Sequence, residues 1–219
     1  AVRYGRRVFA NLRKAIVFVV AVHVPIVGLS ILPVVFGWPM LLMPVHILFL
    51  QLIIDPACSV VFEAEPLEAD AMKVPPRPHD ARLFDMTVLV RGLWQGMGLL
   101  ALLLAVYTTA RGFSKSDDMA RAMTFFVLVL SNLALIFSNR FWNQSALRGG
   151  GSNQAFMWIA AATVTLLAGI LGIPALSRLF AFVTPSPMMP MFGVGAAILS
   201  LLWFEAVKWG LRQQATATA

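Results

Sequence analysis

Long apolar runs alternate with short polar segments along the 219 residues of the chain. Six of these runs reach roughly 20 residues, the length that a helix needs to cross a hydrocarbon core of about 30 Å. They cover residues 15–36, 40–62, 86–109, 122–139, 155–175 and 189–207. We therefore predict an all-α fold, a polytopic membrane helix bundle of six transmembrane helices. Proline and glycine inside several runs predict kinks whose freed backbone groups are satisfied by neighbouring helices.

The polar segments indicate the domain organisation. Residues 1–14 are predicted to form a cytoplasmic stalk that continues into the first span, residues 15–214 a six-span transmembrane domain, and residues 215–219 a polar tail. In the longest polar connection, residues 63–84, the three prolines at 75, 76 and 78 favour an extended path over a helix. It is either a docking strap or a plain surface loop. The chain begins without methionine, which leaves open that it is part of a longer protein.

Composition agrees with this pattern. The chain is 59% hydrophobic and 12% charged, and its mean hydropathy of +0.81 is far above that of a soluble domain. The formal net charge of +7 does not indicate nucleic-acid binding, because the basic residues are not clustered with aromatic residues. The single cysteine, Cys58, excludes an intramolecular disulfide.

Basic residues are distributed unevenly among the connections between the spans. If both termini are cytoplasmic, most basic residues lie on the cytoplasmic side and only Arg111, Lys115, Arg121 and Arg178 lie on the other. The positive-inside rule therefore predicts that both termini are cytoplasmic. The absence of cysteine pairs and organellar signals favours a bacterial inner membrane.

One carboxylate interrupts the second apolar run. Asp55 is followed directly by Pro56, and an aspartate at the centre of a span costs about 2.5–3.5 kcal/mol unless it faces a partner or a cavity. Because Pro56 lacks a backbone donor, carbonyl oxygens become free beside the carboxylate, an arrangement that hard cations prefer. Gln51, one turn earlier, shares the face of Asp55. We predict an ion-binding site with Asp55 and Gln51 as metal ligands; the alternative is a structural ion pair between Asp55 and Arg91.

Three further positions extend this predicted site. His23 and Pro25 interrupt the first run, and Pro25 frees the carbonyl of Ala21. His23 is interpreted as an ion ligand, a proton carrier or a hydrogen-bonded packing residue. Asn132 lies in the middle of the fourth run, where it supplies either an amide oxygen to the ion or an interhelical hydrogen bond.

The other polar residues within the spans are given structural interpretations. His46 is expected at the membrane interface, and Glu205 with Lys208 is expected to form an interfacial ion pair. The chain has no P-loop, HExxH, CxxC or Ser/His/Asp pattern, so no catalytic residue is predicted.

Three segments, GRRVFANLRKAI, IDPACSVVFEAEP and MKVPPRPHDARLF, resemble the C-terminal membrane half of P-type cation-transporting ATPases, in the P2-like group that contains the calcium pumps. The resemblance covers essentially the whole chain as spans five to ten of ten. It implies the transmembrane part of an ATP-driven cation pump, whose partners are membrane lipid, the N-terminal membrane half, and the cytoplasmic phosphorylation, nucleotide and actuator domains. The transported cation binds in the spans, whereas ATP and Mg²⁺ act only in those other domains. The family's DKTG phosphorylation motif does not occur here, so this chain alone is not expected to hydrolyse ATP.

The resemblance also assigns individual positions. Asp55 matches the family's central sixth-span aspartate, and Gln51 matches a ligand amide one turn earlier. His23 falls where calcium pumps have an asparagine, and Asn132 falls where an eighth-span glutamate or glutamine stands. The resemblance therefore implies ion binding by all four residues, with helix breaks at the prolines that follow His23 and Asp55.

Two positions depart from the calcium-pump pattern. Ile26 replaces a glutamate and Ile54 replaces a threonine ligand. Because these departures remove ligand oxygens, a single divalent ion, a monovalent ion and a proton-coupled cycle all stay open. The alternative function is an autonomous six-span channel or secondary cation transporter that uses Asp55 without ATP, and a purely structural membrane subunit is a third interpretation.

Overall fold

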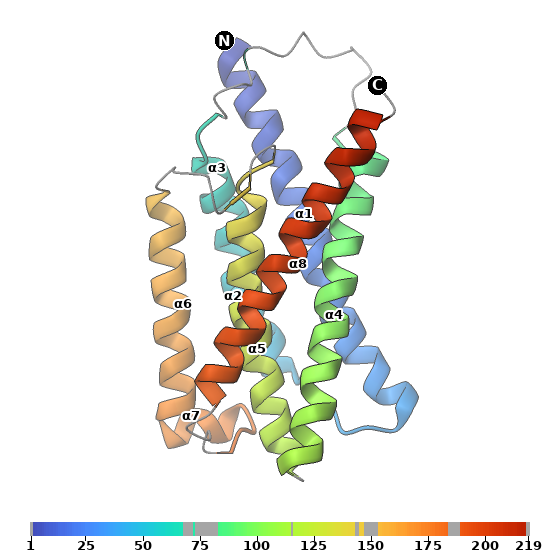
Figure 1. The fold of residues 1–219 in the computed structure, drawn as a ribbon. Helices are drawn as coiled ribbons and strands as arrows, with labels where there is room; N and C mark the ends of the chain where they lie inside the picture. The colour runs from blue at the N-terminus through green and yellow to red at the C-terminus, as the bar shows by residue number, and fades with distance from the viewer. Residues whose placement is uncertain are drawn as a thin grey trace.

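The computed structural model describes residues 2–67, 72, 83–114, 116–142, 145–146, 153–183 and 189–217, which form helices and no strands (Figure 1). The helices are α1 (Val2–Phe36), α2 (Pro44–Pro56), the π-helix η1 (Ala57–Val61), α3 (Phe62–Ala64), α4 (Met86–Ser114), α5 (Asp117–Asn139), α6 (Gln154–Gly172), α7 (Pro174–Leu179) and α8 (Met189–Ala217). In this part of the chain, six helical segments are long and apolar enough to cross a membrane; the second consists of α2, η1 and α3 in series. The predicted all-α bundle of six spans is confirmed.

Helix α1 is longer than a membrane is thick. Its 35 residues span about 52 Å at 1.5 Å per residue, so about 20 Å of helix extends beyond a hydrocarbon core of about 30 Å. Pro25 and Pro33 lie inside the helix and do not end it. The helix ends at Phe36; the φ of 66° at the following Gly37 suits glycine, and the Trp38 N–H donates to the Pro33 carbonyl.

Helix α5 lies at the centre of the bundle and contacts α1, α4, α6 and α8. It is the most buried span, with 72% of its apolar window buried, against 17% for both α6 and α8. Its start is fixed by Ser116, whose hydroxyl accepts from the Met119 N–H. Helices α6 and α8 leave most of their apolar surface open, as helices at a lipid boundary do.

Helices α1 and α4 approach closely because α4 has glycines at the contact. A Cβ atom placed on Gly96 would lie 2.7 Å from the Ala21 carbonyl oxygen and 2.7 Å from Val24 Cβ. Gly92, one turn earlier, is similarly close to Val20. The Ala21 carbonyl, which loses its helical donor at Pro25, is therefore packed against α4.

Two apolar runs differ in detail from their predicted ranges. The run at 155–175 is divided into α6 and α7, because Pro174 cannot continue a helix and instead begins the next one. Helix α8 continues to Ala217, three residues into the segment assigned to the polar tail. The three prolines at 75, 76 and 78 lie outside the described residues, so the interpretation of that connection stays a prediction.

Candidate cation site

Asp55 lies on the outer face of the second span. Leu48, Leu52, Asp55 and Ser59 are all exposed and recur at helical spacing, so they form one stripe along α2 and η1. Gln51, one turn before Asp55, is half-buried beside this stripe. Among the described residues, no ion pair or hydrogen bond engages the Asp55 carboxylate, which is open to a partner from outside this chain.

The backbone changes its hydrogen-bonding pattern directly after Asp55. Pro56 has no N–H, so the Leu52 carbonyl loses its α-helical donor. The chain then continues as the π-helix η1, and the Phe62 N–H donates to the Ala57 carbonyl five residues back. Short π-helices occur often at functional sites. At the predicted helix break the span therefore stays continuous, and its hydrogen-bonding pattern changes from α-helical to π-helical after Pro56. The carbonyl that loses its donor, that of Leu52, lies one turn before Pro56 on the same stripe as Asp55.

His23 is half-buried on α1, and its ring is oriented by its own helix. Its Nδ1 atom lies 2.8 Å from the Val19 carbonyl oxygen. Since a carbonyl only accepts, Nδ1 carries the hydrogen, and the neutral ring then presents the lone pair of Nε2. This arrangement suits a hydrogen-bond acceptor or proton carrier. Pro25, two residues later, stays within α1 and does not interrupt it.

Asn132 lies inside the bundle. Its side chain is 0% exposed, and neither Oδ1 nor Nδ2 has a hydrogen-bond partner among the described residues. The neighbouring Ser131 makes the interhelical bond instead, at 2.8 Å to Ser200 of α8. Asn132 is therefore buried and Asp55 exposed, so the four predicted residues do not all lie on one surface.

Arg91, the alternative partner of Asp55, contacts Trp142. The Arg91 guanidinium carbon lies 4.2 Å from the ring centroid of Trp142, and Nη2 lies 3.4 Å from the Trp142 carbonyl oxygen. Within the described part of the chain, no ion pair joins Arg91 to Asp55. The structural ion-pair interpretation is thus not supported.

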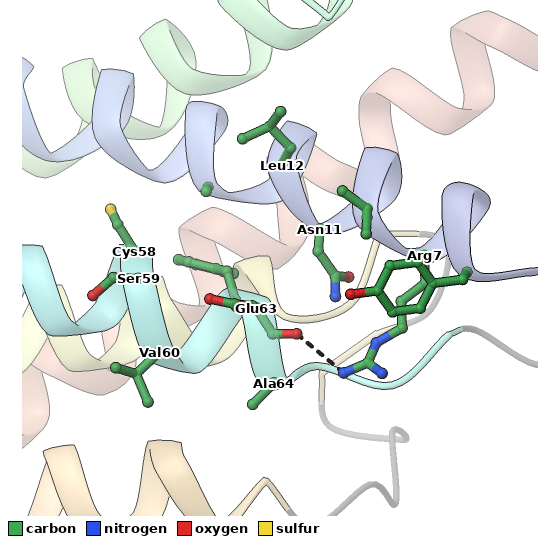
Figure 2. Close-up of a pocket in the computed structure, with 12 residues that line it drawn as sticks. Arg7, Asn11, Leu12, Cys58, Ser59, Val60, Glu63 and Ala64 are labelled. Carbon is green, nitrogen blue, oxygen red and sulfur yellow. Dashed lines mark hydrogen bonds between the residues drawn. The ribbon is translucent and has the colours of Figure 1, made fainter. Parts of the chain in front are cut away.

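A groove of about 700 Å³ separates the N-terminal part of α1 from η1 and α3 (Figure 2). One wall comes from one face of α1 and the other from the segment that follows Asp55; the lining residues are Tyr4, Arg7, Val8, Asn11, Leu12, Ala15, Cys58, Ser59, Val60, Phe62, Glu63 and Ala64. The groove and the Asp55 stripe share the exposed Ser59. The two features therefore adjoin along η1.

Two polar residues near the ends of spans are buried in the bundle. His46 is 0% exposed: its Nδ1 accepts from the Met43 N–H, and its Nε2 lies 2.9 Å from the Phe180 carbonyl oxygen. Its ring also packs on the rings of Phe125 and Phe182. This aromatic cage joins residues more than 130 positions apart, which no local pattern reveals.

The ion pair predicted in the last span is also present. Glu205 and Lys208 form an ion pair, and the Lys208 side chain is only 1% exposed. Lys208 also donates to the Ser138 carbonyl, and Glu205 accepts from the Ser138 hydroxyl. The pair therefore joins α8 to α5.

A buried ionic cluster around Glu65 was missed by the sequence analysis. Glu65 forms an ion pair with Arg140, and both side chains are 3% exposed. Asn153 donates to the same carboxylate at 2.7 Å. The available signal was a glutamate directly after a transmembrane run, in a segment that otherwise looks like a polar loop.

Together, the six long apolar helices define an integral membrane protein. The model of the family described as "Cation transporting ATPase, C-terminus" matches residues 39–210, most of the chain. The chain therefore belongs to this family of C-terminal membrane parts of cation-transporting ATPases.

Curated relatives agree with this assignment. Calcium-transporting ATPase 1 of Lactococcus lactis is 24% identical over 213 residues, which are 95% of this chain and 24% of that protein. The calcium-transporting ATPase of Bacillus subtilis is 26% identical over 210 residues, 92% of this chain and 23% of that protein. A P-type sodium-transporting ATPase of Toxoplasma gondii is 30% identical over 78 residues, 36% of this chain and 6% of that protein. The chain thus spans about a quarter of the length of the first two relatives.

Proposed function

We propose that this chain supplies the C-terminal half of the cation path in an ATP-driven calcium pump, with Asp55 as its central ligand. The observation that carries the proposal is the Asp55 carboxylate, exposed on a transmembrane helix beside a proline and a π-helix. A charged side chain facing lipid is costly, so this face requires a partner that covers it. Family membership supports a pump over the autonomous channel or secondary transporter.

The oxygen donors of this half are few. Ca²⁺ takes 6–8 oxygen ligands, and at the Asp55 surface this chain offers the Asp55 carboxylate, the Gln51 amide and the Leu52 carbonyl. The amide of Asn132 is a further donor that lies inside the bundle, away from this surface. His23 offers nitrogen, which suits Ca²⁺ poorly, so we place it beside the site as a proton carrier or hydrogen-bonding residue. With one carboxylate from this half, a single Ca²⁺ per cycle fits best, completed by ligands from the remainder of the pump.

The partner that covers this face is the N-terminal membrane half of the same pump. The exposed Asp55 stripe adjoins the groove between α1 and η1 at Ser59, so one partner can cover both. The phosphorylation, nucleotide and actuator domains, which bind ATP and Mg²⁺, act on the part of α1 that extends beyond the hydrocarbon core. The basic residues of α1 and of the last turns of α8 support cytoplasmic termini, and the relatives from Lactococcus and Bacillus support a bacterial inner membrane.

The test is Asp55→Asn in the full-length protein that contains this chain, reconstituted in liposomes. Ca²⁺-stimulated ATP hydrolysis and Ca²⁺ uptake are measured against Ca²⁺ concentration, with Mn²⁺, Na⁺ and pH jumps as the comparison panel. We expect Asp55→Asn to raise the half-saturating Ca²⁺ concentration at least about tenfold, the cost of roughly 1.4 kcal/mol of ligand interaction.

The matched control is Asp117→Asn, which neutralises a half-exposed carboxylate that pairs with Arg111 at the far end of the bundle. This control should keep the wild-type Ca²⁺ dependence. Normal Ca²⁺ affinity in Asp55→Asn would contradict the assigned ligand. Stimulation by Na⁺ but not Ca²⁺ would contradict the assigned cation, and cation flux that needs no ATP would favour the secondary transporter.

A further inference from the structure

Glu65 connects three helices at the end of the bundle where the N-terminus lies. It follows α3 directly, and its side chain is buried although the segment EAEP is polar. Its carboxylate accepts from Arg140 Nε at 2.8 Å and from Asn153 Nδ2 at 2.7 Å. Arg140 follows the last residue of α5 and Asn153 caps α6, so the side chain of Glu65 fixes the end of the second span to α5 and α6.

The backbone of Glu65 is engaged by a different helix. Its carbonyl oxygen accepts from Arg7 Nε at 3.0 Å and from Asn11 Nδ2 at 2.7 Å, both on α1. Arg7 also donates through Nη2 to the Glu63 carbonyl at 3.1 Å (Figure 2). The N-terminal part of α1 is thus bound to the end of the second span by the Arg7 guanidinium and the Asn11 amide. The bonds from Arg7 are stronger than neutral hydrogen bonds because their donor is ionised.

Glu65 lies close along the second span to the candidate ion site. Only Pro56, the π-helix η1 and α3 separate it from Asp55. Asn153 also donates to the Val61 carbonyl at 3.0 Å, at the end of η1. A shift of α1 relative to α5 and α6 therefore strains η1, where the hydrogen-bonding register already departs from that of an α-helix.

We propose that Glu65 is a positioning residue that couples the N-terminal part of α1 to the cation site at Asp55. Its carboxylate holds the end of the second span on α5 and α6, and its carbonyl receives the movement of α1. This inference rests on the proposed function, because it assumes that α1 carries movement from the ATP-hydrolysing domains. It adds a residue, ten positions after Asp55, that touches neither the cation nor ATP.

The experiment measures Ca²⁺ ions transported per ATP hydrolysed by the full-length pump in sealed liposomes. Two variants separate the halves of the connection: Glu65→Gln removes the charge that Arg140 pairs with, and Asn11→Leu removes one bond to the Glu65 carbonyl while leaving the ion pair intact. When two sites are energetically coupled, an event at one commonly changes the binding affinity of the other by about fivefold or more. We expect ATP hydrolysis to persist in both variants and the transport ratio to fall about fivefold, and Glu65→Asp to restore part of it.

The matched control is Glu205→Gln, which breaks a buried ion pair that contacts neither α1 nor α3 among the described residues. It should lower the amount of folded pump and keep the wild-type transport ratio. If Glu65→Gln fails to fold, Asn11→Leu alone decides. An unchanged ratio in Asn11→Leu, or an equal fall in Glu205→Gln, would overturn the proposal. If the wild-type protein shows no Ca²⁺-stimulated ATP hydrolysis, the proposed function fails instead.

Discussion

Replacing Asn132 by leucine should separate its role in folding from its role in ion binding. The Asn132 amide is fully buried, and neither of its polar atoms has a partner among the described residues. An unsatisfied buried polar group costs about 1–3 kcal/mol. Leucine has a similar branched shape and no polar atom, so in the absence of cation we expect Asn132→Leu to raise the free energy of unfolding by about 1–3 kcal/mol, less any cost of the larger side chain.

The same substitution should weaken the stabilisation that the cation gives. A ligand that binds only the folded protein stabilises it by RT ln(1 + [L]/Kd). If the Asn132 oxygen is a ligand, its loss raises Kd about tenfold and removes about 1.4 kcal/mol of stabilisation at saturating Ca²⁺. The assay is thermal unfolding of the purified full-length protein with and without Ca²⁺, at one heating rate for all variants.

Ser131→Ala is the matched control, because it changes the adjacent residue and removes the 2.8 Å bond to Ser200. That variant should lose up to about 1 kcal/mol of stability and keep the full Ca²⁺ effect. A rise in stability in Asn132→Leu with an unchanged Ca²⁺ effect would show that Asn132 is not a ligand. A fall in stability without Ca²⁺ would refute the reasoning itself, because the amide would then be satisfied in the folded protein.

Two further predictions concern the packing of the bundle. Gly96→Ala should destabilise the protein by about 1–3 kcal/mol, because the new Cβ meets the Ala21 carbonyl and α1 must shift. The control is Gly112→Ala on the same helix, where a Cβ meets nothing within 4 Å. This variant should be neutral or stabilising in the same thermal unfolding assay. Glu205→Gln should cost about 3–5 kcal/mol because the buried Lys208 loses its ion-pair partner. Adding Lys208→Met should recover most of that loss, and strictly additive costs would contradict a direct pair.

The fold was predictable from the sequence because membrane spans have a minimum apolar length. All six predicted runs contain the core of an observed span. What the sequence could not show was how the helices pack. Gly92 and Gly96 look like weak positions in a helix, yet they permit the close approach of α1 and α4. Helix propensity describes one helix alone, whereas these glycines act through the backbone of a neighbour.

The candidate site was predictable only in part. The cost of a charge in a span identified Asp55, and the missing N–H of proline identified the break at Pro56. The surroundings of Glu65 and His46 were missed, because their partners lie 75 and 134 residues away in the sequence. Both residues stand near the end of a span, where a polar side chain is unremarkable until the structure shows that it is buried.

The prolines at the two predicted helix breaks have different consequences, and the difference follows from what covers each freed carbonyl. At Pro25 the helix continues, because the carbonyl of Ala21 lies against Gly96 of α4, where a residue without a side chain leaves room for it. At Pro56 the stripe that contains Leu52 faces outwards, and none of the helices that the structure describes covers it. The backbone there changes to a π-helix, so the strain of the proline is absorbed within the span. A freed carbonyl that packs against a neighbour stabilises the bundle, whereas one left open beside a carboxylate is available to a cation, and for this reason we place the ion site at Pro56 and not at Pro25.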